Sequence, residues 1–561
     1  MKNINKILGL GLVSAAALGM ASCAESFLDT VSKTEPNSNN YYKTETQAER
    51  ALIGCYDGWR QISSQPGTYP FMIASTIMSD ECYGGSGMSD GFGAQNVDQF
   101  STAPGPSEMN MFEQDWKSYY AGLFRCNTLI TQVDNVEWSS EAKKNQILGE
   151  ARAIRAFLYF DMVRLWGNIP LFTEPSNENR EQADPKDVYA VIFSDLKFAM
   201  ENIPADAYTS ADSFGRITKY ACEAILARAY LFYNGYMGGD PVTVEGTTIT
   251  RADALAACED VIASDRYKLV PDFKDLWPAA SLVPLADGAI GWDPEKSTYA
   301  GDANSEVILC QMFTPTQDYD GNNDSNRWLV NIGMRGLNSS PYGKGWGLAT
   351  ISPKYYSSLF TANDTRRTAS AIDLAGEGVT GSADYANALK DWREYTGYSN
   401  KKYCPLVFGN NSSAATNPDG TGDFMTQNAQ TWIIMRYADV LLMAAELGSS
   451  NGSAYLDQVR SRAGLGHLAL NQQNIMEERA RELAFEGVRY WDLLRQGVDV
   501  MADAVCASAA TVLNGGNEVQ LSYDRAQIIR TKGLCQIPYN QITLSHGVLT
   551  VSYTHLTLPT N

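Results

Sequence analysis

Residue types that most often perform catalysis or bind metals are sparse in this sequence. Its 561 residues include only three histidines, His467, His546 and His555, so acid–base catalysis and histidine-rich metal sites have few candidates. None of the ten cysteines shows C-x-x-C spacing, which disfavours a zinc ribbon or a thioredoxin-like centre. A Walker motif, an H-E-x-x-H string and a dinucleotide-binding glycine string are also missing from the sequence. We therefore predict no catalytic residue, no metal and no cofactor.

Two short strings resemble functional motifs but depart from them at decisive positions. Gly87-Met88-Ser89-Asp90-Gly91 matches the G-x-S-x-G of a nucleophile elbow, which needs a buried strand before the serine and a helix after it. The surrounding glycines favour a turn instead. Oxygen-bearing side chains between residues 318 and 324 resemble the start of a calcium loop, but Asn323 and Leu329 stand where an EF-hand carries Gly and Glu. A solvated polar turn is favoured there, and a loose cation site stays open.

Charge and composition narrow the class of ligand. The chain has 64 acidic and 44 basic residues, a net charge of −20, which repels phosphate backbones and anionic lipid. Nucleic-acid binding and membrane attachment through a basic patch are therefore disfavoured. Carboxylates are plentiful, so a glycosidase pair stays open, because the required separation of about 5–10 Å across a cleft depends on the fold.

Aromatic side chains in long polar stretches are the better-supported functional signal. Aromatic residues make up 11% of the chain, and they accompany Gly, Ser, Asn and Pro in the stretches 82–110, 271–350 and 370–430. A Trp or Tyr ring can cover the apolar face of a sugar while amide and charged groups bond its hydroxyls. We expect a ligand-binding surface on these loops, although core packing is the commoner role of any single Trp.

Seven residues of two Gly/Asn-rich insertions are predicted to contact the ligand. They lie outside the helical periodicity, so no apolar repeat requires them in the core. Asn326 and Arg327 directly precede Trp328, so their polar groups could reach the rim of whatever stacks on that ring. The predicted stacking groups are Tyr83, Phe92, Trp328 and Trp346, and the predicted hydroxyl partners are Asn96, Asn326 and Arg327.

The N-terminus indicates export and lipid attachment. Two lysines precede an apolar run at residues 7–20, which is too short to span a ~30 Å hydrocarbon core but typical of a signal peptide. Ala21-Ser22-Cys23 follows directly and resembles a lipobox. We predict a signal peptide at 1–22, acylation of Cys23, and a polar tether through residue 44. An ordinary signal peptide with a chance cysteine is the alternative.

Beyond the tether, apolar residues three or four apart indicate a mainly helical body. One stretch, Glu477 to Arg495, is rich in Arg and Glu, and we expect its charges to form solvent-facing and inter-helix pairs. No strict repeat is visible, but successive paired helices are compatible with an α-solenoid. The predicted helices lie around residues 146–165, 187–200, 220–233, 252–262, 432–445 and 475–495.

These elements predict one all-α body at 45–550 with large irregular loop insertions. We divide it into an N-terminal part at 45–270, a loop-rich insertion at 271–430 and a C-terminal helical part at 431–550. The tail at 551–561 fits nothing before it and resembles translated adapter sequence, so it is given no structural or functional weight.

Several segments resemble the SusD/RagB family of outer-membrane nutrient-binding lipoproteins. They occur in the family's order, span Cys23 to about Pro538, and are jointly very specific. The C-terminal tail departs from the family's short Asn-Pro-Gly-type ending. The matching segments are 23–29 (CAESFLD), 150–171, 215–219 with 227–231, 436–442, 460–465 and 478–493.

The resemblance implies a scaffold of TPR-like helix pairs without catalytic activity. Ligand contacts would lie in loops above the helices, in the regions that follow Ser79-Asp80-Glu81 and span 320–346. The chain would bind oligosaccharides at the cell surface, anchored in the outer membrane by acyl chains on Cys23, and deliver them to a SusC-like TonB-dependent transporter. Binding of peptides or glycopeptides in the same role is the first alternative. A surface glycoside hydrolase and an assembly scaffold without a small ligand are the others.

Overall fold

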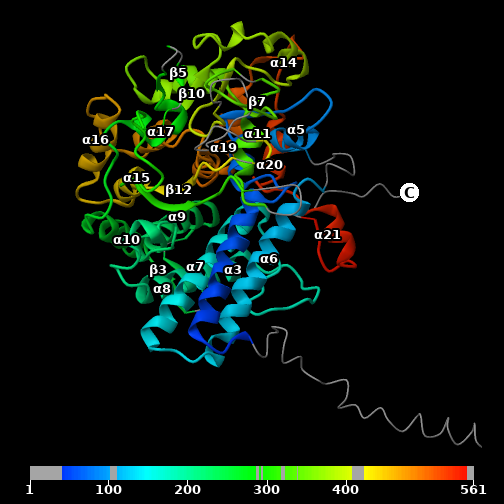
Figure 1. Cartoon of the computed structure of the whole chain (residues 1–561). Helices are drawn as coiled ribbons and strands as arrows, with labels where there is room; N and C mark the ends of the chain where they lie inside the picture. The colour runs from blue at the N-terminus through cyan, green and yellow to red at the C-terminus, as the bar shows by residue number, and fades with distance from the viewer. Residues whose placement is uncertain are drawn as a thin grey trace, which may run out of the picture.

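The computed structural model describes residues 41–101, 110–239, 241–244, 246–285, 288, 290–291, 293, 295–316, 323–337, 339–406, 423–426 and 428–551. Long helices form one end of the molecule, and short strands and irregular segments form the other (Figure 1). Successive long helices pack as pairs: α3 with α6, α7 with α8, and α9 with α10. The all-α prediction with large loop insertions is therefore confirmed.

The first group of long helices forms the end of the molecule drawn in blue to green. Its members are α3 (Glu45–Ser64), α6 (Glu113–Gln132), α7 (Glu141–Trp166), α8 (Pro185–Asn202), α9 (Lys219–Met237) and α10 (Arg251–Ala263). Helix α7 illustrates the local signals at which such a helix begins and ends. The Ser140 side chain caps its first turn by accepting from the Lys143 backbone N–H, and Gly167, at φ 70°, ends it.

A second group of helices continues the stack after a long insertion. Helix α10 packs against α15, although more than 170 residues separate the two in sequence, and α15 packs against α16 and α17. The solenoid is thus interrupted in sequence but continuous in space. The second group comprises α15 (Tyr437–Leu447), α16 (Gly452–Arg462), α17 (Gln472–Glu482), α18 (Arg489–Leu494) and α19 (Val498–Ser508).

Two of the predicted helices are wrong in part. The helix predicted at 432–445 begins only at Tyr437, because β-branched residues before it form a strand that pairs with β6. The helix predicted at 475–495 is broken between α17 and α18, where Phe485 and Gly487 take φ values of 62° and 71°. A Cβ on Gly487 would lie 2.7 Å from a Met72 side-chain carbon, so the break also allows a close approach of α4.

The described strands form seven two-stranded sheets rather than one large sheet. All are antiparallel except the last pair. The pairs are β1 (Cys82–Gly85) with β9 (Leu348–Ile351), β6 (Val307–Gln311) with β12 (Trp432–Arg436), β10 (Ala371–Asp373) with β11 (Tyr398–Asn400), β13 (Thr511–Asn514) with β14 (Asn517–Gln520), β2 (Val242–Val244) with β3 (Thr247–Ile249), β4 (Val283–Pro284) with β5 (Ile290–Gly291), and β7 (Met334–Arg335) with β8 (Lys344–Gly345).

Short helices connect the strands and the two helical groups. The α-helices among them are α4 (Phe71–Ile77), α5 (Phe92–Asp98), α11 (Arg327–Ile332), α12 (Pro353–Leu359), α13 (Arg366–Ser370), α14 (Tyr385–Asp391), α20 (Arg525–Arg530) and α21 (Tyr539–Leu544). The 3₁₀ turns are η3 (Val133–Asn135), η4 (Ala211–Ser213), η5 (Phe273–Leu276), η6 (Pro278–Ala280) and η7 (Val379–Gly381).

Much of the aromatic content of the insertion is used for packing. A second, smaller core lies within the insertion and includes Tyr342, Trp392 and Tyr395, separate from the main helical core. The nine cysteines of the described residues are free thiols, and all but Cys506 are buried. In the described part of the chain, no helix is both long and apolar enough to cross a membrane.

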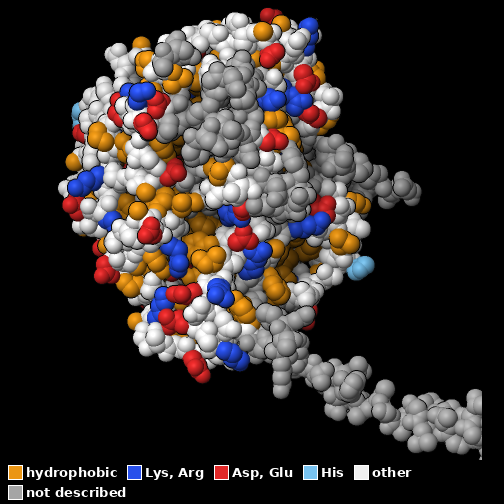
Figure 2. All heavy atoms as spheres, in the orientation of Figure 1, with side chains coloured by type: hydrophobic (Ala, Val, Ile, Leu, Met, Phe, Trp, Pro, Cys, Tyr) orange, Lys and Arg blue, Asp and Glu red, His pale blue; other side chains and the backbone are white. Residues whose placement is uncertain are grey.

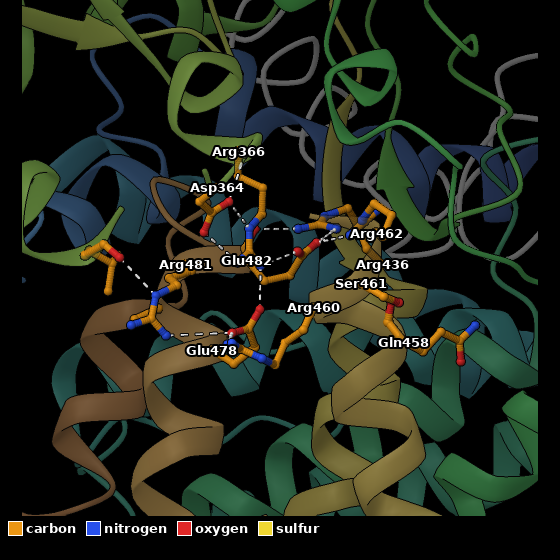
Figure 3. A network of polar contacts seen from close by, with 12 residues as sticks. Asp364, Arg366, Arg436, Gln458, Arg460, Ser461, Arg462, Glu478, Arg481 and Glu482 are labelled. Carbon is orange, nitrogen blue, oxygen red and sulfur yellow. Dashed lines mark hydrogen bonds and ion pairs between the residues drawn. The ribbon is translucent and has the colours of Figure 1, made fainter. Parts of the chain in front are cut away.

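The Arg/Glu-rich stretch forms a buried ion-pair network instead of a solvent-facing surface. Figure 3 shows Glu478 and Glu482 of α17 pointing toward arginines from other segments. Arg366 Nη1 lies 2.7 Å from Glu478 and 3.0 Å from Glu482, and all three side chains are fully buried. The prediction of inter-helix pairs is confirmed, whereas that of solvent-facing charge is wrong for these residues. The network joins α17 to α13, α16 and β12.

Candidate functional site

Pairing of β1 with β9 joins the two regions in which ligand contacts were predicted. In this antiparallel pair Gly85 lies opposite Leu348, so the segment that follows β1 runs beside the segment that precedes β9. The Ser86 backbone N–H donates to the Gly347 carbonyl at 2.7 Å. Residues 86–92 and 344–347 are therefore neighbouring segments, and together we call them the loop site.

Asp90 and Arg335 determine the shape of the loop after β1. The Asp90 carboxylate accepts from the Gly87 backbone N–H at 3.0 Å and from the Arg335 guanidinium at 2.8 Å. Arg335 also bonds Asp391 at 2.8 Å, which ties this loop to the end of α14. Partial burial acts to raise the pKa of Asp90, but the hydrogen bond and charge of Arg335 lower it below its usual value. At neutral pH the loop is therefore held by ionised groups.

Phe92 is the predicted stacking residue with the most exposed ring, 47% accessible. It opens α5 directly after Gly91, which has a φ of 65° and where an added Cβ would lie only 2.1 Å from the Ser86 hydroxyl oxygen, so only glycine fits there. The Arg393 guanidinium lies 4.2 Å from the ring centroid and donates to the carbonyls of Met88 and Asp90 at 2.8 and 3.1 Å. One face of the ring is thus backed by a fixed cation.

Trp346 provides a second, half-buried ring on the adjoining segment. Its backbone N–H donates to the Val330 carbonyl at 2.8 Å, and the Arg327 guanidinium lies 4.8 Å from its ring centroid. Lys344 lies similarly over Phe424, at 4.7 Å. Phe424 was missed in the sequence, where its place at the end of a Gly/Asn/Ser-rich run was the available signal.

Three of the predicted contacts are wrong because the side chains lie in the core. Tyr83 is fully buried and donates its hydroxyl to the Ser508 carbonyl at 2.6 Å. Trp328 is 1% exposed and stacks on Tyr403 at a centroid distance of 5.0 Å. Asn326 is also 1% exposed, and its side chain caps α11 by accepting from the Trp328 backbone N–H at 2.9 Å. Because these three side chains are buried, they cannot stack on a sugar or bond its hydroxyls.

The remaining predicted contacts stay predictions. Asn96 is half-buried on α5, and Arg327 is 6% exposed with Nη1 donating to the Met425 carbonyl at 2.9 Å.

Several other predictions fall on residues that the structure does not describe. The acyl-anchor residue Cys23, the signal peptide, most of the tether and the tail from 552 onward lie outside the described residues. The same holds for the first three oxygen ligands of the calcium-like loop, while Asp324 pairs with Arg60 at 2.5 Å.

Two catalytic alternatives can be placed on the structure. The first is the serine of the G-x-S-x-G string. Ser89 is exposed in a turn that does have a strand before it and a helix after it, contrary to expectation, but β1 and α5 are only four and seven residues long.

The second alternative is a carboxyl pair of the kind that a glycosidase uses. Asp98 and Glu394 lie beneath the Ser89 turn as such a pair, but each side chain is only 1% exposed. Burial, followed by the charge of Glu394, raises the pKa of Asp98. Among the described residues, no cluster of three or more His, Cys, Asp or Glu side chains could hold a metal ion.

The segment before β1 anchors the loop site to the helical scaffold. Arg489 forms two hydrogen bonds with Asp80, at 2.9 and 2.8 Å. Glu81 is fully buried, and Oε1 accepts from the Phe485 backbone N–H at 2.9 Å, while Oε2 has no hydrogen-bond partner in the described part of the chain. Burial raises the pKa of Glu81 to about 8. The carboxyl group is therefore largely protonated at neutral pH in the folded protein.

Glu81→Gln should make the protein more stable than the wild type at pH 8 and leave stability near pH 5 almost unchanged. Between the ordinary value of 4.5 and about 8, the folded wild type holds a proton that the unfolded chain has lost, so its stability falls as pH rises. Glutamine removes that titration. Urea unfolding at several pH values measures the slope. Glu518→Gln, exposed on β14, is the control, and an unchanged slope in Glu81→Gln would contradict the assignment.

Comparisons with known proteins agree with this architecture. One family model, described as "SusD family", matches residues 305–551, and another, described as "Starch-binding associating with outer membrane", matches residues 71–231. SusD-like protein P25 of Formosa agariphila is 24% identical over 86% of this chain and 89% of its own length. A SusD-like protein of Bacteroides ovatus is 23% identical over 86% of this chain and 81% of its own length.

Solved structures show the same fold. A laminarin-binding SusD-like protein is 25% identical, with a TM-score of 0.68 over 91% of this chain and 99% of that one. Surface glycan-binding protein A from Bacteroides thetaiotaomicron, solved with laminarihexaose, is 22% identical, with a TM-score of 0.69 over 91% of this chain and 100% of that one. The paired-helix scaffold and its loop-rich insertions are therefore shared with these proteins.

Proposed function

Since the chain belongs to the SusD/RagB family, we propose that it is a non-catalytic, cell-surface glycan-binding lipoprotein. It captures oligosaccharides and delivers them to a SusC-like TonB-dependent transporter. The glycan ligands named for two proteins of the same fold support a sugar as its ligand. We propose that it lies in the outer membrane, anchored by acyl chains on Cys23 and facing the extracellular side. The description of one family model, "associating with outer membrane", supports the outer-membrane location.

The meeting of two ring-bearing segments at the β1–β9 pair carries the proposal of a sugar site. Phe92 and Trp346 lie on adjoining segments, and each ring is backed by a guanidinium, from Arg393 and Arg327. An apolar ring beside fixed polar groups suits a sugar, which has both C–H faces and hydroxyls.

Phe92→Ala and Trp346→Ala should each weaken binding of the preferred glycan by about twofold to tenfold, because an aromatic contact contributes about 0.5–1.5 kcal/mol beyond burial. Calorimetry measures the affinity, and thermal melting checks the fold. Phe124→Ala on α6 is the matched control, since that ring is 44% exposed away from the loop site. Unchanged affinity in both variants would remove this site.

Arrays of polysaccharides and peptides identify the ligand class. Binding to glycans alone is expected, whereas binding to peptides alone would favour the peptide-uptake alternative. Release of reducing sugar by the purified protein would contradict a non-catalytic role. Recovery of a barrel-forming transporter by pull-down from native membranes is expected, since lasting complexes commonly bury more than about 2,000 Å².

A further inference from the structure

Two carboxyl groups are buried at the base of the loop site without an ion-pair partner. Asp98 on α5 and Glu394, shortly after α14, are each 1% exposed. Neither carboxylate forms an ion pair with a Lys, Arg or His side chain in the part of the chain that the structure describes. By contrast, the equally buried Asp439 pairs with both Arg228 and Arg479. The hydrogen-bond partners of the Asp98–Glu394 pair are all uncharged.

Glu394 joins the end of β1 to α5. Its Oε2 accepts from the Gly85 backbone N–H at 2.8 Å, and its Oε1 accepts from Gln95 Nε2 of α5 at 2.9 Å. Glu394 takes φ 51°, in the left-handed region that residues other than glycine rarely adopt, and its backbone N–H donates to Asn514 Oδ1 at 2.8 Å. Contacts from three segments therefore hold this carboxylate in place.

Asp98 makes the complementary contacts from the end of α5. Its Oδ2 accepts from the Gly84 backbone N–H at 3.4 Å, and its Oδ1 accepts from the Tyr523 hydroxyl at 2.8 Å. The turn at 86–91 runs from β1 to α5, and Phe92 opens α5. The two carboxyl groups thus fix both ends of the segment that carries the exposed Phe92 ring.

The charges of the surrounding elements do not neutralise the pair. Figure 2 shows Lys and Arg side chains beside Asp and Glu side chains at the part of the surface where Figure 1 labels α5 and α14. Arg335 pairs with Asp90 and Asp391, each at 2.8 Å. The Arg393 charge lowers the pKa of Glu394, but burial outweighs it and the net shift is upward. The other titratable groups that act on the pair are Cys82, Tyr83 and Tyr523, and burial raises the pKa of each, so they are uncharged at neutral pH.

Two like charges this deeply buried are too costly to keep, so the pair retains a proton. Burial, followed by the charge of Glu394, raises the pKa of Asp98 well above 3.8, and burial raises that of Glu394 above 4.5. The unfolded chain, with ordinary carboxyl pKa values, loses these protons at lower pH. The stability that the pair contributes to the fold therefore falls as pH rises above those ordinary values.

We propose that the Asp98–Glu394 pair is a pH switch for the loop site. With one proton on the pair, a single negative charge is held by the donors of β1, α5 and Tyr523, and Phe92 stays in place. Loss of that proton at alkaline pH leaves two repelling charges in the core, and relief of the repulsion separates α5 from β1. The consequence for glycan binding rests on the proposed function, whereas the separation itself does not.

Hydrogen–deuterium exchange of the amides at 82–98, measured without a ligand, tests the switch. After correction for the intrinsic exchange rate at each pH, protection in the wild type should fall by at least about tenfold between about pH 6 and about pH 10, while α7 stays protected. Protection that does not change with pH would overturn the proposal. Because no glycan is needed, the result is independent of whether the proposed function is correct.

Four variants assign the effect. Asp98→Asn keeps an oxygen that accepts from Tyr523 and removes one charge, so its protection should be nearly independent of pH. Tyr523→Phe removes a hydrogen bond that lowers the pKa of Asp98, so the loss of protection should move to higher pH. Glu81→Gln, which removes the other buried carboxyl group beside β1, and Asp212→Asn, exposed on η4, are the controls and should behave like the wild type.

A wild-type pH dependence in Asp98→Asn, or its loss in Glu81→Gln, would overturn the assignment to this pair. Should Asp98→Asn fail to fold, Tyr523→Phe decides, and an unshifted profile in that variant would count against the switch.

Discussion

Replacing Glu482 by alanine should lower the free energy of unfolding by about 3–5 kcal/mol, the usual cost of removing one partner from a buried ion pair. Glu482 is fully buried on α17, and its carboxylate accepts from Arg366 at 3.0 Å, from Arg436 at 2.9 Å and from Arg462. The substitution leaves these three guanidiniums without a shared counter-charge in the core. Urea unfolding followed by circular dichroism measures the loss.

A neighbouring glutamate on the same helix is the matched control. Glu477 pairs with Arg481 at 3.4 Å, but its side chain is 44% exposed. Its replacement by alanine should cost less than about 1 kcal/mol, because solvent screens the pair. Equal losses in the two variants would contradict the importance that we assign to burial.

The network around Glu482 should also make the protein sensitive to acid. Burial acts to raise the pKa of Glu482, but Arg462, Arg436 and Arg366 lower it well below the ordinary value of 4.5. A lowered carboxyl pKa stabilises the folded protein above pH 4.5, and that stability is lost as pH falls toward the folded pKa. Glu482→Gln should therefore show a smaller loss of stability on acidification below pH 4.5 than the wild type does.

Cys23→Ala should release nearly all of the protein from the outer membrane. In the proposed anchor, two or three acyl chains each contribute about 0.8 kcal/mol per buried CH₂ group, whereas a single chain binds only marginally. Without the thiol, the lipid cannot be attached, so soluble or unprocessed protein is expected. Membrane fractionation and immunoblotting measure the distribution.

A second cysteine variant controls for the loss of a thiol as such. Cys506 is a free, half-buried thiol on α19, far along the chain from the proposed anchor. Cys506→Ala should fractionate with the outer membrane like the wild type. Normal outer-membrane levels of Cys23→Ala would contradict the anchor.

Local signals in the sequence predicted the helices well where capping and periodicity agree. Helix α7 was predicted around 146–165 and spans Glu141–Trp166, with Ser140 as its cap and Gly167 at its end. Prediction was wrong where tertiary pairing overrides a local pattern. Residues 432–436 have helical spacing but form β12, because the partner strand β6 lies more than a hundred residues earlier in sequence.

Exposure of single aromatic residues was the least predictable property. Trp328 follows two polar residues in a Gly/Asn-rich stretch, which favours a loop, yet Asn326 caps the short helix α11 and the ring packs on Tyr403. Phe92 lies in similar surroundings and is 47% exposed. The difference in exposure therefore comes from tertiary contacts, such as the packing of Tyr403 on the Trp328 ring, and not from the local sequence.

The sequence by itself determined the proposed export signal, the family resemblance and the paired-helix scaffold, because these depend on local order, on periodicity and on caps such as Ser140. Only the tertiary structure decided which loops meet and which charges are buried. The β1–β9 pair brings residue 86 beside residue 347, and Glu482 meets arginines from α13, β12 and α16. Such contacts depend on chain segments distant in sequence, whose hydrogen-bond and charge partners are chosen by burial and not by local pattern.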